Sequence, residues 1–242
     1  MRAFRWRFLH LCLYARTIIS RTIKNELEMN TIRLQNIVPQ VFAANPDLQS
    51  EVWRQDLTLE KGKKYLVEAD SGMGKSTFCS YLIGHRNDFT GSLLFDGRNS
   101  AEFSEKDWTN LRQRHISSLF QDLRLFPELS AWENVQIKNR LTDFATDAQI
   151  ETWFNQLKIS EKRHEKVGVM SFGQQQRVAL IRALVQPFDF LLADEPVSHL
   201  DDGNGELMGQ LIAEEAARQG AAVIATSIGK HIPLNYDKII RL

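Results

Sequence analysis

The chain has 242 residues, of which 43% are hydrophobic and 25% charged, so it can bury a sizeable core in one or two domains. Its two cysteines, Cys12 and Cys79, exclude a disulfide framework and a cysteine-based zinc site, and they fit a reducing cytoplasm. The 30 basic residues balance the 30 acidic ones overall, but residues 1–24 hold six bases and no acid, which leaves 24 bases against 30 acids beyond them. A body this acidic is not expected to bind nucleic acid.

Residues 1–28 are predicted to be an extension, and the sequence leaves its role open. Its longest apolar stretch, at 8–15, contains His10 and is about half as long as a membrane-spanning helix must be. No clean small-residue cleavage site follows, which argues against a secretory signal. A basic amphipathic segment lying on anionic lipid is one alternative. We prefer a loose extension or a misplaced start, with the folded domain spanning 29–242.

From residue 31 onward, short β-type runs alternate with helical patterns. Strands are expected at 31–37, 51–59, 63–69, 91–97, 115–120, 188–194, 221–226 and 238–242. Several are continuously apolar, as strands covered on both faces must be, and helical segments separate them at 76–86, 174–186 and 203–219. Between 126 and 171 aromatic-rich helical sequence replaces the strands, which indicates a helical insertion. This alternation predicts the α/β class.

A glycine-containing loop, ADSGMGKST at 69–77, lies between a predicted strand and a predicted helix. In that context backbone N–H groups and the positive end of the helix dipole point at bound phosphates. Glycines let the backbone approach, the lysine reaches the β and γ phosphates, and the serine hydroxyl can bind Mg²⁺. The residues expected to bind ATP in this loop are Ser71, Gly72, Met73, Gly74, Lys75, Ser76 and Thr77.

One residue of the loop departs from the strict pattern G-x-x-x-x-G-K-[ST], and a second carries an unexpected charge. Ala69 replaces the first glycine, which costs about 1–2 kcal/mol only if that residue must adopt a left-handed conformation. The charge of Asp70 would repel a phosphate about 6 Å away by about 3 kcal/mol at an effective dielectric constant of about 20. The Asp70 side chain is therefore expected to point away from the nucleotide.

An apolar strand at 188–194 ends in two carboxylates. Asp194 is placed to hold Mg²⁺ opposite Ser76, and Glu195 is placed to orient and deprotonate a water molecule.

Three further motifs follow in the same chain: LFQD around Gln121, SFGQ at 171–174 after Met170, and SHLD at 198–201. With the phosphate loop and the acid pair, they resemble the ATP-binding subunit of ABC transporters over about residues 31–242. The amino-acid sequence at 121–135 and 191–202 is most similar to the lipoprotein-release, macrolide-export and cell-division branch. The resemblance implies a P-loop NTPase core of the ABC type, with an antiparallel β subdomain and a helical insertion at about 122–175.

The resemblance also implies an ATPase that drives transport through ATP-dependent dimerisation. In this family two domains enclose two ATP molecules, each held by the phosphate loop of one subunit and the SFGQ-type signature of the other. Adenine is expected to stack on Phe42, with Trp53 as the alternative, and ordinary packing is open for both rings. The remaining roles implied are catalysis by Glu195, Lys75, Gln121 and Ser227, Mg²⁺ binding by Ser76, Gln121 and Asp194, and ATP binding across the dimer by Ser171, Gly173 and Gln174.

One position departs from the family in a way that affects the chemistry. Ser227 stands where the family has a switch histidine that contacts the γ-phosphate. A hydroxyl reaches less far and carries no positive charge, so slow turnover is one expectation. His231 could replace the histidine only if its loop folds back; the alternative is a surface histidine.

The expected partners are a second copy or another ATP-binding subunit, and a separate permease with several membrane spans. The chain would then lie peripherally on the cytoplasmic face of the inner membrane. Leu125 and Phe126, with Pro127 shaping the turn, stand where the family docks its membrane subunit, although ordinary burial is equally open. Two other functions stay under consideration: a low-turnover nucleotide-dependent switch, for which Ser227 and Ala69 are the support, and, more remotely, a small-molecule kinase.

Overall fold

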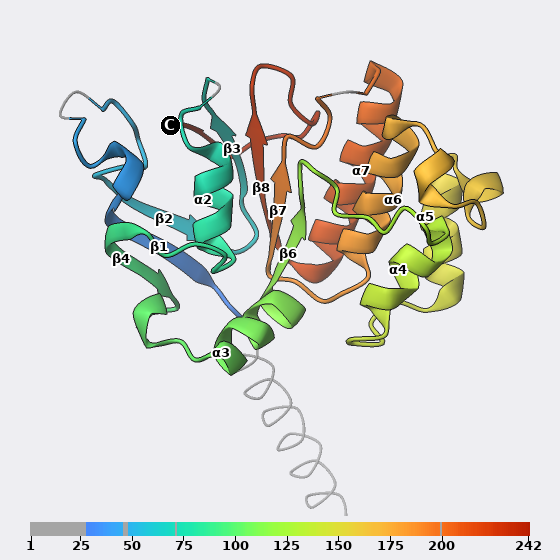
Figure 1. Cartoon of the computed structure of the whole chain (residues 1–242), viewed down its shortest axis with the longest axis horizontal. Helices are drawn as coiled ribbons and strands as arrows, with labels where there is room; N and C mark the ends of the chain where they lie inside the picture. The colour runs from blue at the N-terminus through green and yellow to red at the C-terminus, as the bar shows by residue number, and fades with distance from the viewer. Residues whose placement is uncertain (1–27, 46–47, 71, 199) are drawn as a thin grey trace, which may run out of the picture.

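Figure 1 shows the computed structural model, which describes residues 28–45, 48–70, 72–198 and 200–242. An antiparallel and a parallel sheet lie on either side of one helix, and further helices cover the far face of the parallel sheet. The α/β class and the antiparallel sheet agree with the prediction. The extension predicted at 1–28 lies outside the described residues except for Glu28, and so do Ser71 and His199.

The antiparallel sheet has the strand order β2-β1-β4-β5. Its strands are β1 (Thr31–Pro39), β2 (Asp56–Glu60), β4 (Phe89–Phe95) and β5 (Arg98–Asn99). The register of β1 against β4 shifts between Gln35 and Val38, where β1 approaches Gly91. A β-carbon on Gly91, whose φ is +92°, would lie 2.4 Å from the carbonyl oxygen of Asn36, so this bulge requires glycine.

The parallel sheet has the strand order β6-β7-β8-β3-β9. Its strands are β3 (Lys64–Glu68), β6 (Ile116–Leu119), β7 (Phe190–Asp194), β8 (Ala222–Ser227) and β9 (Lys238–Arg241). Every residue of β7 and β8 is buried, as expected for strands covered on both faces. Because the strands are parallel, the carboxyl ends of β3, β7 and β8 meet at one edge, where a ligand site forms in such sheets.

The helices cover both faces of the parallel sheet. Between the two sheets lies α2 (Lys75–Leu82), and on the opposite face lie α6 (Phe172–Leu184) and α7 (Asp202–Gln219), with α4 (Ala131–Asn139) and α5 (Asp147–Gln156) beyond them (Figure 1). The remaining helical segments are α3 (Glu105–Asn110), the π-turn Leu111–His115 and short 3₁₀ turns at Gln40–Phe42, Ser100–Glu102, Ser160–Lys162 and Val167–Val169. Among the described residues, no helix is both long and apolar enough to traverse a bilayer.

Several expected elements begin at least two residues from their expected start: β4, expected from 91, begins at Phe89, and β7, expected from 188, begins at Phe190. The strand expected at 51–59 starts only at Asp56, because residues 51–55 form turns that bury Trp53. The helix expected from 174 begins at Phe172, because Ser171 caps it. There the Ser171 hydroxyl accepts the backbone N–H of Gln174 at 3.3 Å, and the Gln174 side chain accepts the N–H of Ser171 at 2.9 Å.

An ionic cluster joins the two sheets at the edge opposite the strand carboxyl ends. The Asp189 carboxylate accepts from Lys61 at 2.6 Å, from His115 at 2.7 Å and from the backbone N–H of Met29 at 2.8 Å. Burial alone would raise the pKa of Asp189, but the hydrogen bonds from His115, Lys61 and Met29 outweigh it and lower that pKa. The cluster holds the starts of β1, β6 and β7 together.

Candidate nucleotide site

The loop from β3 to α2 has the geometry of a phosphate cradle. Gly72 and Gly74 have φ of +83° and +98°, and Gly74 precedes the first helical residue, Lys75. The described residues of positive φ include these two glycines but not Ala69, so the left-handed cost considered for Ala69 does not arise. Lys75 is buried, and its ammonium donates to the carbonyl oxygens of Ala69 at 2.8 Å and Asp70 at 3.0 Å. Lys75 thus holds the backbone of the loop in place at the start of the helix.

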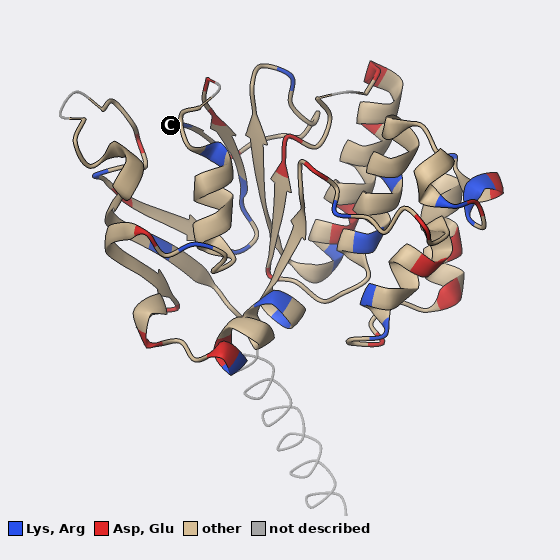
Figure 2. Ribbon diagram, in the orientation of Figure 1, with Lys and Arg blue, Asp and Glu red and all other residues tan. Residues whose placement is uncertain are grey.

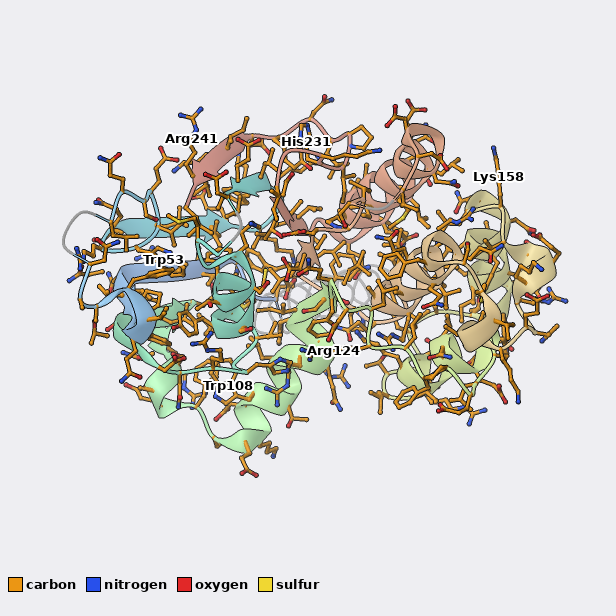
Figure 3. All side chains as sticks on the ribbon, turned by 45° about the horizontal axis from the view of Figure 1, so that its top comes forward. Trp53, Trp108, Arg124, Lys158, His231 and Arg241 are labelled. Carbon is orange, nitrogen blue, oxygen red and sulfur yellow. The ribbon has the colours of Figure 1, made fainter. Side chains whose placement is uncertain are left out.

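Two aromatic rings support this loop from below. A β-carbon on Gly74, whose φ is +98°, would lie 3.0 Å from the Phe42 ring and 3.3 Å from the Trp53 ring, so a larger residue would be strained and would push the rings by a few tenths of an ångström. The Trp53 indole N–H donates to the carbonyl oxygen of Met73 at 3.4 Å. Trp53 is 1% exposed and contacts Phe78 and Tyr81, so it offers no free face for stacking (Figure 3). Phe42 is only half-buried, and adenine stacking on it stays a prediction.

The carboxyl ends of β7 and β8 position the acid pair. Asp194 and Thr226 are paired in register, and the Thr226 hydroxyl donates to the Asp194 carboxylate at 2.5 Å. The same hydroxyl accepts the backbone N–H of Glu195 at 3.0 Å. Thr226 therefore orients both acidic residues, a role that the sequence analysis missed because the contact spans 32 residues between neighbouring strands. Glu195 adopts φ +48°, an uncommon conformation for a non-glycine residue that clusters at functional sites.

Two residues predicted to be catalytic, Lys75 and Gln121, contact the carboxylate of a third, Glu195. The Lys75 ammonium lies 3.7 Å from one Glu195 oxygen, and the Gln121 amide donates to the other at 3.2 Å. Lys75 and Glu195 are 5% and 9% exposed, so little solvent screens the pair. The carboxylate is thereby held in one orientation at the phosphate loop, as a group that positions a water molecule must be.

The residues predicted to hold Mg²⁺ also come together. Ser76, Gln121 and Asp194 line one cavity of about 220 Å³ between α2 and the ends of β6 and β7. They bring a hydroxyl, an amide oxygen and a carboxylate, which are the hard oxygen ligands that Mg²⁺ prefers. The donor set therefore fits this ion. The last loop residue, Thr77, lies beside the cavity lining and accepts from Arg86 at 3.0 Å.

The SFGQ segment is remote from this cavity. Ser171, Gly173 and Gln174 open α6, which lies across the parallel sheet from α2 (Figure 1). Ser171 and Phe172 are exposed there. The structure thus gives one chain a phosphate loop with its acid pair at one place and an exposed serine-glycine helix start at another.

A comparison with family models matches residues 53–198 to the ABC transporter domain. The chain belongs to the ABC transporter family. It is an ATP-binding subunit of this family and an ATPase, so the recognition, the P-loop NTPase fold of ABC type and the nucleotide as ligand are confirmed.

Relatives and solved structures agree with this assignment. The chain is 32% identical over 190 residues to the lipoprotein-releasing system ATP-binding protein LolD of Zymomonas mobilis, covering 77% of the chain and 82% of LolD. It is 31% identical over 193 residues to the macrolide export ATP-binding/permease protein MacB of Shewanella sp., covering 77% of the chain but 29% of MacB. The dimeric cassette MJ0796 bound to ADP and Pi superposes with a TM-score of 0.67 at 26% identity, covering 81% of this chain and 87% of that one.

In this ABC ATPase, Ser227 occupies the position where the family resemblance implies a switch histidine. Ser227 is fully buried, and its hydroxyl donates to the carbonyl oxygen of Lys230 at 2.8 Å. His231 is exposed; its ring packs edge-on against Tyr236 and its Nδ1 lies 3.3 Å from the carbonyl oxygen of Gly229. The structure therefore directs the Ser227 hydroxyl to the following turn, and its contact with a γ-phosphate stays a prediction.

The segment after Gln121 separates the two residues expected to dock a membrane subunit. Leu125 packs against the core cluster of α6 and α7, whereas Phe126 is 50% exposed. The fully buried Asn134 fixes the turn, because its side chain accepts the Phe126 N–H at 2.8 Å and donates to the Phe126 carbonyl at 3.0 Å. Sequence reasoning credited this turn to Pro127 and missed Asn134.

Proposed function

We propose that this chain hydrolyses ATP with Mg²⁺ to drive a membrane transport complex of the lipoprotein-release or macrolide-export type. It would do so as a pair of ATP-binding subunits joined to a separate multi-span permease, peripherally on the cytoplasmic face of the inner membrane. Residues 29–242 would form the ATP-binding domain, with the helical insertion at about 122–175. The similarity to LolD and MacB and the dimeric MJ0796 cassette support this proposal.

The observation that carries the catalytic part is the Lys75–Glu195–Gln121 cluster. Gln121 and Lys75 hold the Glu195 carboxylate, so it can accept a proton from the attacking water as that water bonds to the γ-phosphorus. Lys75 and the loop amides would stabilise the charge that builds up on the phosphate oxygens. Mg²⁺ bound by Ser76, Gln121 and Asp194 would neutralise charge on the β and γ phosphates. ADP and inorganic phosphate would be the products.

In one chain the phosphate loop and the SFGQ helix start lie apart, and this separation supports the proposed pairing of two subunits. The exposed start of α6 presents Ser171, Gly173 and Gln174 away from their own phosphate loop. In a pair, Ser171 and the Gly173 amide would contact the γ-phosphate held by the other subunit. The half-exposed Phe126 is the residue that we assign to the permease contact.

A Glu195→Gln substitution tests the catalytic proposal. Because the amide cannot accept the proton, we expect phosphate release to fall at least a hundredfold while ATP binding is retained. Glu161→Gln, in an exposed 3₁₀ turn remote from the site, is the matched control and should match the native chain. Phosphate release that is equal in Glu195→Gln and the native chain would refute the proposed role.

The low-turnover switch is the second candidate, and the buried Ser227 favours it. The same measurement separates the two functions. A switch would bind ATP and dimerise, but the native chain would release phosphate no faster than Glu195→Gln.

A further inference from the structure

Lys230 bridges the turn after β8 to the chain that precedes α7. Its carbonyl oxygen accepts the Ser227 hydroxyl at 2.8 Å. Its ammonium donates to the carbonyl oxygen of Leu200 at 2.6 Å and to the carboxylate of Asp202 at 2.9 Å. One residue thus contacts both the switch position and the Leu200–Asp202 segment, where the chain leaves the acid pair for α7.

The bond to Leu200 is the stronger of the two ammonium contacts. Asp202 is 92% exposed, and an exposed ion pair contributes little. The Leu200 carbonyl, in contrast, belongs to a residue that is 7% exposed and accepts at the shorter distance of 2.6 Å, so water competes less for this bond. Lys230 therefore acts mainly by holding the backbone at Leu200.

Leu200 lies between the segment that follows Glu195 and the start of α6. On one side, the Leu200 N–H donates to the carbonyl oxygen of Val197 at 3.2 Å. In the same turn, the Ser198 hydroxyl donates to the carbonyl oxygen of Glu195 at 3.2 Å. On the other side, a β-carbon on Gly173 would lie 2.9 Å from the Leu200 side chain. The position of Leu200 therefore bears on Glu195 and on the start of α6 together.

We propose that Lys230 is a positioning residue for ATP hydrolysis, tying the end of β8 to Leu200 so that Glu195 and the SFGQ helix start keep their places. This inference rests on the proposed ATPase function. Lys230 acts through the backbone and does not touch nucleotide. Lys230 thereby fixes the turn after Ser227, which stands where the family has a switch histidine.

Steady-state kinetics of three variants test the role of the ammonium. Lys230→Met keeps the length of the side chain and removes the charge, so we expect kcat for ATP to fall about tenfold while KM changes less than twofold. Lys230→Arg keeps a donor and should recover most of kcat. Lys238→Met, an exposed lysine on β9, is the matched control and should equal the native chain. An unchanged kcat in Lys230→Met, or a loss that Lys230→Arg does not relieve, would overturn the proposal.

Hydrogen exchange of the nucleotide-free protein gives a second readout that does not depend on turnover. Lys230→Met should speed exchange at the Leu200, Asn204 and Gly205 amides several-fold and leave the amides of α6 beyond its first turn unchanged. If native chain and Glu195→Gln release phosphate equally, the proposed function fails, and exchange at these amides still decides the positioning role. Equal exchange in Lys230→Met and the native chain would refute it, as would uniformly faster exchange throughout, which indicates general destabilisation.

Discussion

Ser227 shows how one residue can depart from a family pattern while the site around it stays assembled. Its hydroxyl is fully buried and bonded to the Lys230 carbonyl, so the side chain completes the turn after β8. The acid pair next to it is oriented by Thr226 of the same strand, whose hydroxyl contacts both acidic residues. Because Ser227 is fully buried, a larger side chain here would either displace its neighbours or enter the cavity of about 350 Å³ that Ser227 lines with Ala69 and Gly229.

We therefore expect Ser227→His to fail as a repair of the switch position. The imidazole would overpack the end of β8, at a cost of about 1–3 kcal/mol, and would break the bond to Lys230. The melting temperature should fall by roughly 2–10 °C without a gain in kcat. Ser227→Ala, which removes only the hydroxyl, is the control and should melt closer to the native chain. A several-fold rise in kcat with an unchanged melting temperature would contradict this prediction.

At the same scale, the sequence predicts contiguous site residues well and distant ones poorly. The phosphate loop and the acid pair are local patterns, and the structure brings Lys75, Gln121 and Glu195 together as predicted. Thr226 and Lys230 act through partners 28 to 32 residues away, and no local pattern marks such contacts. The resemblance supplied Gln121, which composition and periodicity do not single out.

At the scale of elements, one cation ties α6 to the segment after Gln121, and a second ties α4 to β6. Arg182 of α6 donates to the carbonyls of Leu123 and Arg124, both at 2.5 Å, and these two residues adopt φ of +56° and +49°. Arg124 in turn lies over the Phe120 ring at 4.0 Å (Figure 3). Lys138 of α4 is half-buried beside Arg182, and its ammonium lies 3.5 Å from the Ser117 hydroxyl. The two positive charges of Lys138 and Arg182 thus lie close to each other.

Lys138 should make stability depend on pH. Burial, and secondarily the charge of Arg182, lowers its pKa from 10.5 to about 7. Between these two pKa values the unfolded chain binds more protons, so the contribution of Lys138 to stability rises with pH from about 7 to about 10.5. Lys138→Met should be more stable than the native chain by roughly 3 kcal/mol at pH 7, and this advantage should shrink as the pH approaches 10.

Chemical unfolding at pH 7, 8.5 and 10 measures this change. Lys158→Met, whose parent side chain extends into solvent in Figure 3, is the control and should show no comparable pH-dependent difference. A Lys138→Met variant that is less stable than the native chain at pH 7 would show that the ammonium is compensated in the folded state.

Helices and strands were predictable from the sequence where a single local effect, apolar burial or helix capping, determines them. Strands β7 and β8 are continuously apolar, and the helix starts at Ser171 and Asp201 carry capping side chains. The stretch 51–55 was predicted to be strand because of its apolar residues. Packing of Trp53 beneath Gly74 and Met73 overrides that local preference and leaves only Asp56–Glu60 in the sheet.

At the scale of the whole molecule, topology favours association through specific edges. Figure 2 shows acidic and basic residues interspersed along the same elements. The phosphate loop precedes α2 and the SFGQ helix start opens α6, on opposite sides of the parallel sheet in Figure 1. Two copies placed head to tail would bring each loop to the other copy's helix start, which makes two equivalent sites by symmetry.

Mixing two inactive variants tests this arrangement. Lys75→Ala removes the loop cation and leaves Ser171 intact, whereas Ser171→Arg blocks the helix start and leaves Lys75 intact, at a capping cost of about 1 kcal/mol. Each variant alone should be inactive, because every site in its dimer lacks one half. An equimolar mixture should recover about a quarter of native kcat, since about half of the dimers are mixed and each has one complete site. If each chain completed its own site, mixing would restore nothing, and that outcome would overturn the two-half-site arrangement.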